Sequence, residues 1–558
     1  MKKNIKSIKK DYSVVIGGAA GQGSRKAGLI IAKLFNKLGY NIYIYEEYQS
    51  LIRGGHNFSQ ITASEKEITN RKEKIDFLLA LDKKTIQKHK KNINKEGLLF
   101  FNSNKIEEKG VGIEADKIVK ESDGLPIMAN IALIAGLAKT IGIDWSVLKK
   151  ILEEEIGKEL EKNLKVAENS FHSVSSLLKI EKTKNNPKLL MTGNEAIARG
   201  MAKAGLDIYF AYPMTPASSI LHYFAAHQKE TKIIAVQSEN EIAVASEAIG
   251  AAFAGKRSAV ASSGGGFALM TETISLAAQA EIPFMVINSQ RMGPATGVPT
   301  YGGQSDLLFS LWAGHGDFEK FVVAPSDAEE SFYWAGKLLN LCWQYQTPSI
   351  LLTEKDISEG TFSVNKEVLN KVKKEKELLW TGKGDYERYK ITPSGISPLA
   401  YPGTKNAIVK ANSYEHNEKG YSEEESKEMI EAMQTKRLTK FKLMEQEVEA
   451  LESVKIYGNK KSKTAVVAWG LGAIAARTAV EALGLKLIQP IVLAPFPKKQ
   501  IKKAFSGIEK VICVEVNALG QMAILLEGQG IKIDKKILKY DSTPFLSEEL
   551  EKQIRSIK

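Results

Sequence analysis

Cysteine is nearly absent from this chain. Its 558 residues include two, Cys342 and Cys513, which lie far apart in apolar surroundings. Such sparse use of cysteine favours a reducing compartment, so we expect a cytoplasmic protein with neither disulfides nor metal sites. An iron–sulfur cluster needs several thiolate ligands, which this chain cannot supply alone. Any cluster that the protein works with is expected on another polypeptide.

Long apolar runs are also missing, although apolar residues make up 43% of the chain. No stretch approaches the run of about 20 apolar residues that a transmembrane helix needs, so we expect no membrane span. The basic first residues, MKKNIKSIKK, are not followed by the apolar stretch and cleavage site of a signal peptide. The length predicts three or four domains with ample hydrophobic cores.

Positive charge is in excess, with a formal net charge of +13. The lysines are interleaved with glutamates in amphipathic segments such as 145–165, and they form no stripe of basic and aromatic side chains. We therefore expect no nucleic-acid partner. A solvated lysine-rich surface explains the charge, and attraction of an acidic partner or of phosphate groups is the alternative.

The segment from Ile208 to Phe318 alternates strand-like and helix-like stretches, which predicts an α/β domain with a parallel sheet. Each expected strand ends in a turn rich in glycine, serine or proline. Such turns gather at the carboxyl edge of a parallel sheet and can form a ligand pocket there. The expected strands are 208–211, 233–236, 258–261 and 283–288.

The first of these turns is Tyr212-Pro213-Met214-Thr215-Pro216. Its two prolines remove backbone donors and favour extended geometry in the residues before them. A helix start at Ser218 follows directly. Thr215 is therefore predicted to lie in a rigid turn at the end of a strand.

Two carboxylates, Glu239 and Glu241, precede a helix at 242–255 that is rich in alanine and glycine. A helix that is apolar on every side is expected to be buried all round. Capping the free N–H groups of this helix is the simpler role, and we expect it for Glu239. Glu241 differs because it begins the buried face itself.

Two later turns carry further candidates. One is Ser263-Gly264-Gly265-Gly266. The other begins at Arg291 and places a permanent cation beside Thr296 and Thr300, a combination suited to holding a carboxylate. An ordinary surface arginine fits the pattern equally well.

Residues 12–180 are expected to form a first α/β domain, with a strand at 12–16, a glycine turn at 17–23 and a helix at 24–38. This order is typical of a dinucleotide fold, but the glycine spacing is GxxGxG where that fold has GxGxxG. The turn Gly21–Ser24 could take a phosphate with help from Arg53, and a purely structural turn with a core arginine is the alternative.

Further features of this domain are predicted from composition. His56 has no second ligand at metal-binding spacing, so a loop hydrogen bond is expected of it. Helices are expected at 126–141 and 145–161, and the polar run KIEKTKNNP at 179–187 reads as a linker.

Three more parts follow the linker: a domain at 188–380, a linker with a long helix at 381–454, and a last domain at 455–558. The last domain has a GxGxxA turn at 470–475. No acid follows at the end of the next strand, 487–491, so this turn is expected to be structural.

Five blocks within 212–318 occur in a specific order: YPMTPAS, QSENEIA, SSGGGFALM, QRMGPATGVPT and GQSDLLFSLWAGHGDF. Together they resemble the α subunit of the 2-oxoacid:ferredoxin oxidoreductases, thiamine-diphosphate enzymes that oxidise 2-oxoacids to acyl-CoA. The earlier series GGAAGQG, EEYQS and RGGHNF resembles the γ subunit of the same enzymes. The resemblance implies a γ domain, a pyrimidine-binding α domain and a domain similar to the transketolase C-terminal domain, fused on one chain.

The resemblance also implies roles for individual residues. Glu241, with Gly250 nine residues on, matches the glutamate that hydrogen-bonds the thiamine pyrimidine, whereas Glu239 does not. Thr215 would contact the carboxyl and keto groups of the substrate. The other expected contacts are Tyr212, Pro213, Arg291 and Thr300 with substrate, Ser263, Gly264 and Gly265 with cofactor, and Gly21, Gly23 and Arg53 with CoA.

The diphosphate and Mg²⁺ of thiamine enzymes need a GDG-plus-Asn loop, and the sequence contains none. The cofactor is therefore expected across an interface with a β subunit that brings Mg²⁺ and a 4Fe–4S cluster and passes electrons to ferredoxin. A dimer of such heterodimers is expected, with CoA as co-substrate. Arg291 and Thr300 favour a dicarboxylate such as 2-oxoglutarate over pyruvate or branched-chain acids.

Two other functions stay open at this point. A flavoprotein or NAD dehydrogenase would use the glycine turns at 17–23 and 470–475. A non-catalytic scaffold of the same complex would use neither. His315 is expected to be structural, and Glu415 and His416 are expected in a loop network, with a face toward the partner subunit as the alternative.

Overall fold

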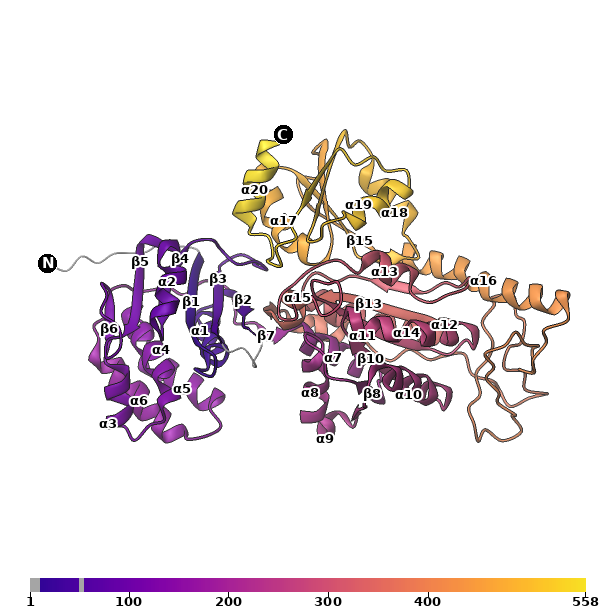
Figure 1. Cartoon of the computed structure of the whole chain (residues 1–558), viewed down its shortest axis with the longest axis horizontal. Coiled ribbons are helices and arrows are strands. Elements are labelled where there is room, and N and C mark those ends of the chain that lie inside the picture. Colours follow the sequence, from indigo (N-terminus) through magenta and orange to yellow (C-terminus); the bar gives the residue numbers. More distant parts are fainter. Residues whose placement is uncertain (1–10, 50–54, 558) are drawn as a thin grey trace. The chain divides into compact units, whose positions relative to one another are not determined.

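The computed structural model describes residues 11–49 and 55–557, and these form two compact units (Figure 1). The first unit contains the chain up to residue 191 together with the short segments 360–364 and 546–548. The second unit contains 192–359, 365–545 and the rest of the C-terminal segment. Each unit is described by itself.

The first unit is built on a mixed sheet in the order β6-β5-β4-β1-β3-β2-β14-β7. β1 pairs with β4 in parallel but with β3 antiparallel, and β2 also pairs with β3 antiparallel. This pairing differs from the all-parallel sheet of a dinucleotide fold. The strands are β1 (Asp11–Ala19), β2 (Asn41–Glu47), β3 (His56–Ser64), β4 (Ile75–Ala80), β5 (Ile93–Asn102), β6 (Val111–Ile113), β7 (Leu189–Thr192) and β14 (Thr361–Val364).

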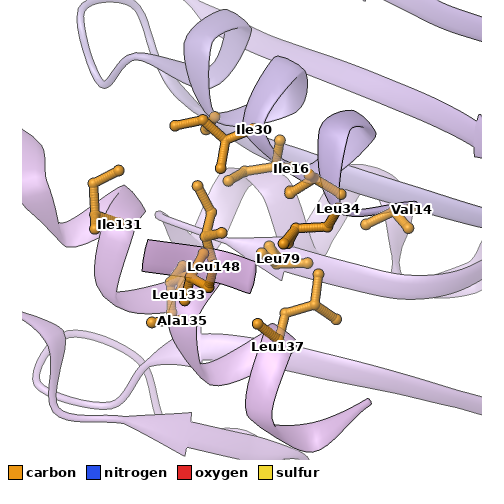
Figure 2. Close-up of a cluster of buried hydrophobic side chains, with 14 of the residues drawn as sticks. Val14, Ile16, Ile30, Leu34, Leu79, Ile131, Leu133, Ala135, Leu137 and Leu148 are labelled. Carbon is orange, nitrogen blue, oxygen red and sulfur yellow. The ribbon is translucent and has the colours of Figure 1, made fainter. Parts of the chain in front are cut away.

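Helices pack on this sheet around one apolar cluster, which Figure 2 shows with side chains from β1, α1, β4, α4 and α5. α4 is buried along almost its whole length, as expected for a helix that is apolar on every side. The helix predicted at 145–161 is wrong, because the chain breaks at 156–159, where Glu159 has a left-handed φ of 53°. The helices are α1 (Ser24–Lys37), α2 (Lys83–His89), α3 (Ala115–Glu121), α4 (Ala129–Thr140), α5 (Trp145–Glu155) and α6 (Leu160–Ser173).

The polar run at 179–187 is bound to the first unit. The Thr183 hydroxyl donates to the Gly39 carbonyl at 2.8 Å, and the Asn185 amide donates to the Glu65 carbonyl at 2.8 Å. Backbone and side-chain hydrogen bonds therefore hold in place a segment whose composition predicts a linker.

The second unit contains a seven-stranded sheet in the order β18-β12-β13-β11-β10-β8-β9. From β12 to β9 every pairing is parallel, which confirms the predicted α/β class. The strands are β8 (Ile208–Ala211), β9 (Ile234–Gln237), β10 (Ser258–Ser262), β11 (Phe284–Gln290), β12 (Phe321–Val323), β13 (Pro348–Glu354) and β18 (Val492–Ala494).

The helices of this sheet follow its strands, with α7 and α14 in close contact along their lengths. β13 ends at Glu354, and Lys355 to Glu359 form a short helix directly after it. The helices are α7 (Gly193–Lys203), α8 (Ser218–Ala226), α9 (Gln228–Thr231), α10 (Glu241–Phe253), α11 (Gly264–Leu269), α12 (Thr271–Gln279), α13 (Leu307–Trp312), α14 (Ala328–Tyr345) and α15 (Lys355–Glu359).

The C-terminal part of this unit forms a five-stranded sheet in the order β15-β17-β16-β19-β20. The glycine motif at 470–475 opens α17 directly after β16, so the turn expected there is the first turn of a helix. The elements are β15 (Val454–Gly458), β16 (Thr464–Ala468), α17 (Gly470–Leu483), β17 (Lys486–Pro490), α18 (Lys498–Phe505), β19 (Lys510–Glu515), α19 (Gln521–Gly528), β20 (Lys535–Leu538) and α20 (Ser547–Ser556).

The long segment between the two sheets is fastened by a buried ion cluster. Within α16 (Lys427–Ala450), the ammonium groups of Lys436 and Lys440 each lie 2.6 Å from the carboxylate of Glu281. Burial opposes the charge on Glu281, but the two lysines outweigh it and hold its pKa well below its usual range. Arg388 donates to the Glu281 carbonyl at 2.6 Å and ties the extended segment to the same point.

Glu354 links the two sheets of the second unit. It is fully buried at the end of β13, and its Oε1 accepts hydrogen bonds from the Leu471 amide at 3.2 Å and from the Gln304 side chain at 3.0 Å. Its Oε2 has no hydrogen-bond partner within the described residues. Burial raises the pKa of Glu354 to about 8, so this carboxyl group is protonated at neutral pH.

None of the helices in the described part of the chain is long and apolar enough to cross a membrane.

The substitution Glu354→Gln tests whether the carboxyl group of Glu354 is protonated in the folded protein. Folded Glu354 keeps its proton up to about pH 8, whereas the unfolded chain releases it near pH 4.5, so the parent protein loses stability as the pH rises through that window. Glu354→Gln keeps the shape without the ionisation. We expect its unfolding temperature to match the parent's below pH 4.5 and to exceed it by a few degrees at pH 8, measured by calorimetry. A difference that does not grow with pH would contradict the assignment.

Candidate functional site

The carboxyl ends of β8, β10 and β11 bring the predicted site residues of the second unit together. Glu241 begins α10 and is 3% exposed. Its Oε1 accepts a hydrogen bond from the Ser262 hydroxyl at 3.0 Å. Capping of this helix comes from Asn240, whose side chain accepts from the Ala243 amide at 2.9 Å, and Glu239 is exposed. The capping role expected of Glu239 is therefore wrong.

The glycines after Ser263 open helix α11, where the sequence predicted a turn. Gly266 lies so close to Glu241 that any side chain there would collide with its carboxylate. Gly264 is similarly close to the carboxylate of Asp306, whereas the space beside Gly265 is open. The absence of side chains at Gly264 and Gly266 lets α11 approach the two carboxylates closely, and only Gly265 borders open space.

Thr215 and Arg291 meet at the ends of β8 and β11. The Arg291 Nη1 donates to the Thr215 carbonyl at 3.0 Å. Burial lowers the pKa of Arg291, while the charges of Asp306 and Glu241 act in the opposite direction. Arg291 is therefore partly buried and contacts another candidate residue, which differs from a solvated surface arginine.

The turn that carries Thr215 is held from α7. Asn194 is fully buried, and its amide donates to the Pro216 carbonyl at 2.7 Å and to the Ser219 hydroxyl at 2.8 Å. Tyr212 is 39% exposed at the rim of the same turn, and Pro213 is partly buried.

Asp306 lies beside these candidate residues and is not among those that the sequence predicts. Its Oδ2 accepts from the Asn288 amide at 3.2 Å, and its own backbone amide donates to the Gln290 side chain at 2.8 Å. Burial raises the pKa of Asp306, and Asn288 and Arg291 counter that effect. In the sequence, Asp306 is a single acid before an apolar helix start, and this pattern is too common to indicate a functional residue.

Two buried polar atoms at the sheet edge have no hydrogen-bond partner among the described residues. They are the Ser263 hydroxyl and the Asn288 Oδ1, and both side chains are fully buried. Ser262 pairs with Asn288 in the β10–β11 register, so the two atoms belong to adjacent strand ends. Unpartnered buried polar atoms are costly, and a polar ligand at this edge would satisfy them.

One face of α10 is exposed, so the prediction that this helix is buried all round is wrong for the chain alone. Ile242, next to Glu241, is 54% exposed, and nothing lies near Gly250. Ile234 on the edge strand β9 and Leu269 at the end of α11 are also about half exposed. An apolar surface therefore adjoins the buried carboxylate.

Five further candidate residues of this unit are Thr296, Thr300, His315, Glu415 and His416. Thr300 is buried in the same loop as Arg291, and Thr296 is exposed. His315 is exposed. His416 is buried against Tyr389, with its Nδ1 2.9 Å from the Tyr414 carbonyl, and Glu415 pairs with Arg437, which fits the loop network.

In the first unit, Gly17 and Gly18 lie inside β1, closely packed against His56, Thr85 and Leu81. Gly21 and Gly23 form the turn before α1, with φ values of 90° and 72°. That turn is held by Asn130, whose amide donates to the Gln22 carbonyl at 3.0 Å. Arg53, expected on the CoA side, lies outside the described residues.

His56 does have a second histidine beside it, contrary to the expectation from local spacing. The Nε2 atoms of His56 and His89 lie 3.0 Å apart, and both rings are buried. Burial lowers the pKa of His56 to about 4 and that of His89 to about 3, so both are neutral at physiological pH. Within the described residues, no cluster of three or more His, Cys, Asp or Glu could hold a metal ion.

Comparison with known families and structures identifies the kind of protein. Residues 13–173 match the family "Pyruvate ferredoxin/flavodoxin oxidoreductase", and residues 199–436 match "Pyruvate flavodoxin/ferredoxin oxidoreductase, thiamine diP-bdg". The α subunit of a 2-oxoacid:ferredoxin oxidoreductase from a Sulfolobus species is 32% identical, over 97% of this chain and 96% of that protein.

Two further relatives are named for 2-oxoglutarate. The 2-oxoglutarate synthase subunit KorA of Methanothermobacter marburgensis is 30% identical, over 59% of this chain and 88% of that protein. The structure of a 2-oxoglutarate:ferredoxin oxidoreductase from Magnetococcus marinus, with 2-oxoglutarate, coenzyme A and succinyl-CoA bound, matches with a TM-score of 0.89 at 28% identity, over 98% of this chain and 99% of that one. The chain described here therefore belongs to the α-subunit family of the 2-oxoacid:ferredoxin oxidoreductases, with the γ portion fused at its N-terminus.

Proposed function

We propose that this chain is the fused γ-plus-α subunit of an enzyme that decarboxylates 2-oxoglutarate oxidatively to its acyl-CoA and passes the electrons to ferredoxin through a β subunit. The observation that carries the proposal is Glu241, an acid 3% exposed at a helix start, beside a glycine run in which Gly265 borders open space. An acid in such a site is costly unless a ligand or partner uses it.

The residues around Glu241 fit the pyrimidine end of thiamine diphosphate. Glu241 begins α10 and accepts a hydrogen bond from the Ser262 hydroxyl, and its carboxylate would accept a further one from a protonated ring nitrogen. The space beside Gly265 is open, and the unpartnered Ser263 hydroxyl would supply a polar contact. When bound, this cofactor supplies the electron sink for cleavage beside a carbonyl group.

We place the rest of the cofactor site on a β subunit. The described residues offer no cluster for a metal ion, and the sequence lacks the cysteines for a cluster. The exposed side chain of Ile242, next to Glu241 in the sequence, is suited to a covering partner. Mg²⁺ and the 4Fe–4S cluster would come with that partner, in a dimer of heterodimers.

Arg291 and Thr215 would hold the 2-oxoacid. The Thr215 carbonyl uses one nitrogen of Arg291, which leaves the other donors of the guanidinium for a carboxylate. Tyr212 and Pro213 line the same turn, and Thr300 lies in the Arg291 loop. The choice of 2-oxoglutarate is supported by relatives named for that substrate.

CoA is assigned to the γ portion, at the turn of Gly21 and Gly23. The turn precedes the uncapped N-terminus of the 14-residue helix α1, which favours a phosphate. The related Magnetococcus enzyme was solved with coenzyme A bound.

A nucleotide-binding dehydrogenase is disfavoured by packing at both glycine motifs. Gly17 and Gly18 are filled against neighbouring side chains, and Gly470 packs on Glu354 and Gln304. A non-catalytic scaffold would not need the buried acid beside an open glycine surface.

Glu241→Gln tests the role of the carboxylate. The amide keeps the hydrogen bond to Ser262 but loses the charge, so we expect kcat to fall by about a thousandfold with assembly unchanged. Turnover of the purified complex is the measurement, with Glu239→Gln as the exposed control that should behave like the parent. Retained activity in Glu241→Gln would falsify the assignment.

Arg291→Ala tests the choice of substrate. Loss of the guanidinium should raise KM for 2-oxoglutarate by about tenfold more than KM for pyruvate, because only the dicarboxylate offers a second anionic group. Steady-state kinetics with both acids provide the comparison. Equal changes in both KM values would count against a contact to the substrate tail.

A further inference from the structure

The loop at 291–306 is fixed at its base and open at its tip. It has no helix or strand of its own apart from a bridge between Met292 and Val298. The amide of Asp306 donates to the Gln290 side chain and closes the loop at the strand end. Residues 294–298 are exposed, whereas 302–304 are buried.

Gln304 makes five hydrogen bonds, of which four join this loop to the C-terminal domain and one goes to Glu354 at the end of β13. Its backbone amide donates to the Val516 carbonyl at 2.8 Å, and its Oε1 accepts from the Val516 amide at 2.9 Å. Its Nε2 donates to the Trp469 carbonyl at 2.8 Å and to Glu354 at 3.0 Å. Its carbonyl accepts from the Asn517 amide at 3.1 Å, so every donor of this fully buried glutamine is used.

Gln304 binds the C-terminal sheet at the ends of two neighbouring strands. Trp469 and Val516 directly follow β16 and β19, which are neighbours in the order β15-β17-β16-β19-β20. The chain goes from β16 to β17 on one side and returns to β19 on the other, so this is the switch point where open α/β sheets bind ligands. In this sheet the side chain of Gln304, from the loop at 291–306, occupies that crevice.

Two further contacts act on the same loop. Gly302 lies against the Asp356 carboxylate and Leu471, with no space for a side chain. The Ser542 hydroxyl lies 3.3 Å from the Met292 sulfur. The loop is thus held from α15 and from the C-terminal domain at once.

We propose that Gln304 is a positioning residue through which the C-terminal domain sets the substrate loop and hence the affinity for the 2-oxoacid. The inference rests on the proposed role of Arg291 and Thr300 in substrate binding. The C-terminal domain, in which the sequence shows no chemistry, then contributes to substrate binding by holding the loop base rigid.

The test compares two buried glutamines in the assembled enzyme. Gln489 also links the C-terminal sheet to the larger sheet, donating to the Ser326 hydroxyl at 3.1 Å and to Glu330 at 3.0 Å, but it does not touch the loop. We expect Gln304→Ala to raise KM for the 2-oxoacid by about tenfold with a smaller change in kcat. We expect Gln489→Ala to lower the unfolding temperature similarly with KM unchanged.

Amide hydrogen exchange over residues 292–303 supplies a second readout. Exchange should accelerate in Gln304→Ala and stay as in the parent in Gln489→Ala. Gln304→Met keeps the side-chain volume and removes the side-chain hydrogen bonds, so it gives the same test without a cavity. Equal KM values in the two alanine variants, or unchanged exchange in both Gln304 variants, would overturn the proposal.

Arg291→Ala, measured in parallel, separates the two levels of the argument. An effect of Arg291→Ala without an effect of Gln304→Ala overturns the positioning role alone. If Arg291→Ala leaves KM unchanged, the substrate role of the loop fails, and the positioning proposal falls with it.

Discussion

A carboxylate that is almost completely removed from water is the constraint around which the second unit is arranged. Among the described residues, Glu241 receives one side-chain hydrogen bond, from Ser262, and it lies at a helix start. Such support is modest for a buried charge. Gly266 brings the next helix against the same carboxylate, and the open surface beside Gly265 leaves room for a further partner. The space beside Glu241 is therefore partly open in the described part of the chain, which fits the proposed cofactor site.

The same sheet edge has a second function, because it is also where the two sheets of the unit are joined. The neutral carboxyl group of Glu354 and the amide of Gln304 can lie in contact because neither carries a charge at neutral pH. A charged pair in their place would carry a large desolvation cost. Gly470 completes the contact, since a side chain there would collide with Glu354. The buried polar contacts of Gln304 and Glu354 therefore both pack the last domain and hold the loop at 291–306 in place.

Sequence patterns predicted the parallel sheet and the places of Thr215, Glu241 and Arg291, because strand ends and helix starts are local signals. Non-local pairings were beyond them: His56 meets His89 through strand β3 and helix α2, and Asp306 reaches Asn288 across a long loop. The glycine motifs misled for another reason. Gly266 and Gly470 are needed for close approach to carboxylates inside helices, and composition alone cannot distinguish that from a turn.

The wrong prediction for α10 carries information of its own. An alanine- and glycine-rich helix was expected to be buried on every side, yet Ile242 is 54% exposed and Gly250 faces open space. Composition reflects the environment in which the sequence functions, including surfaces that other polypeptides cover. Since α10 packs on β8 and β10 while Ile242, next to Glu241, stays exposed, the discrepancy marks the surface that the proposed partner would cover.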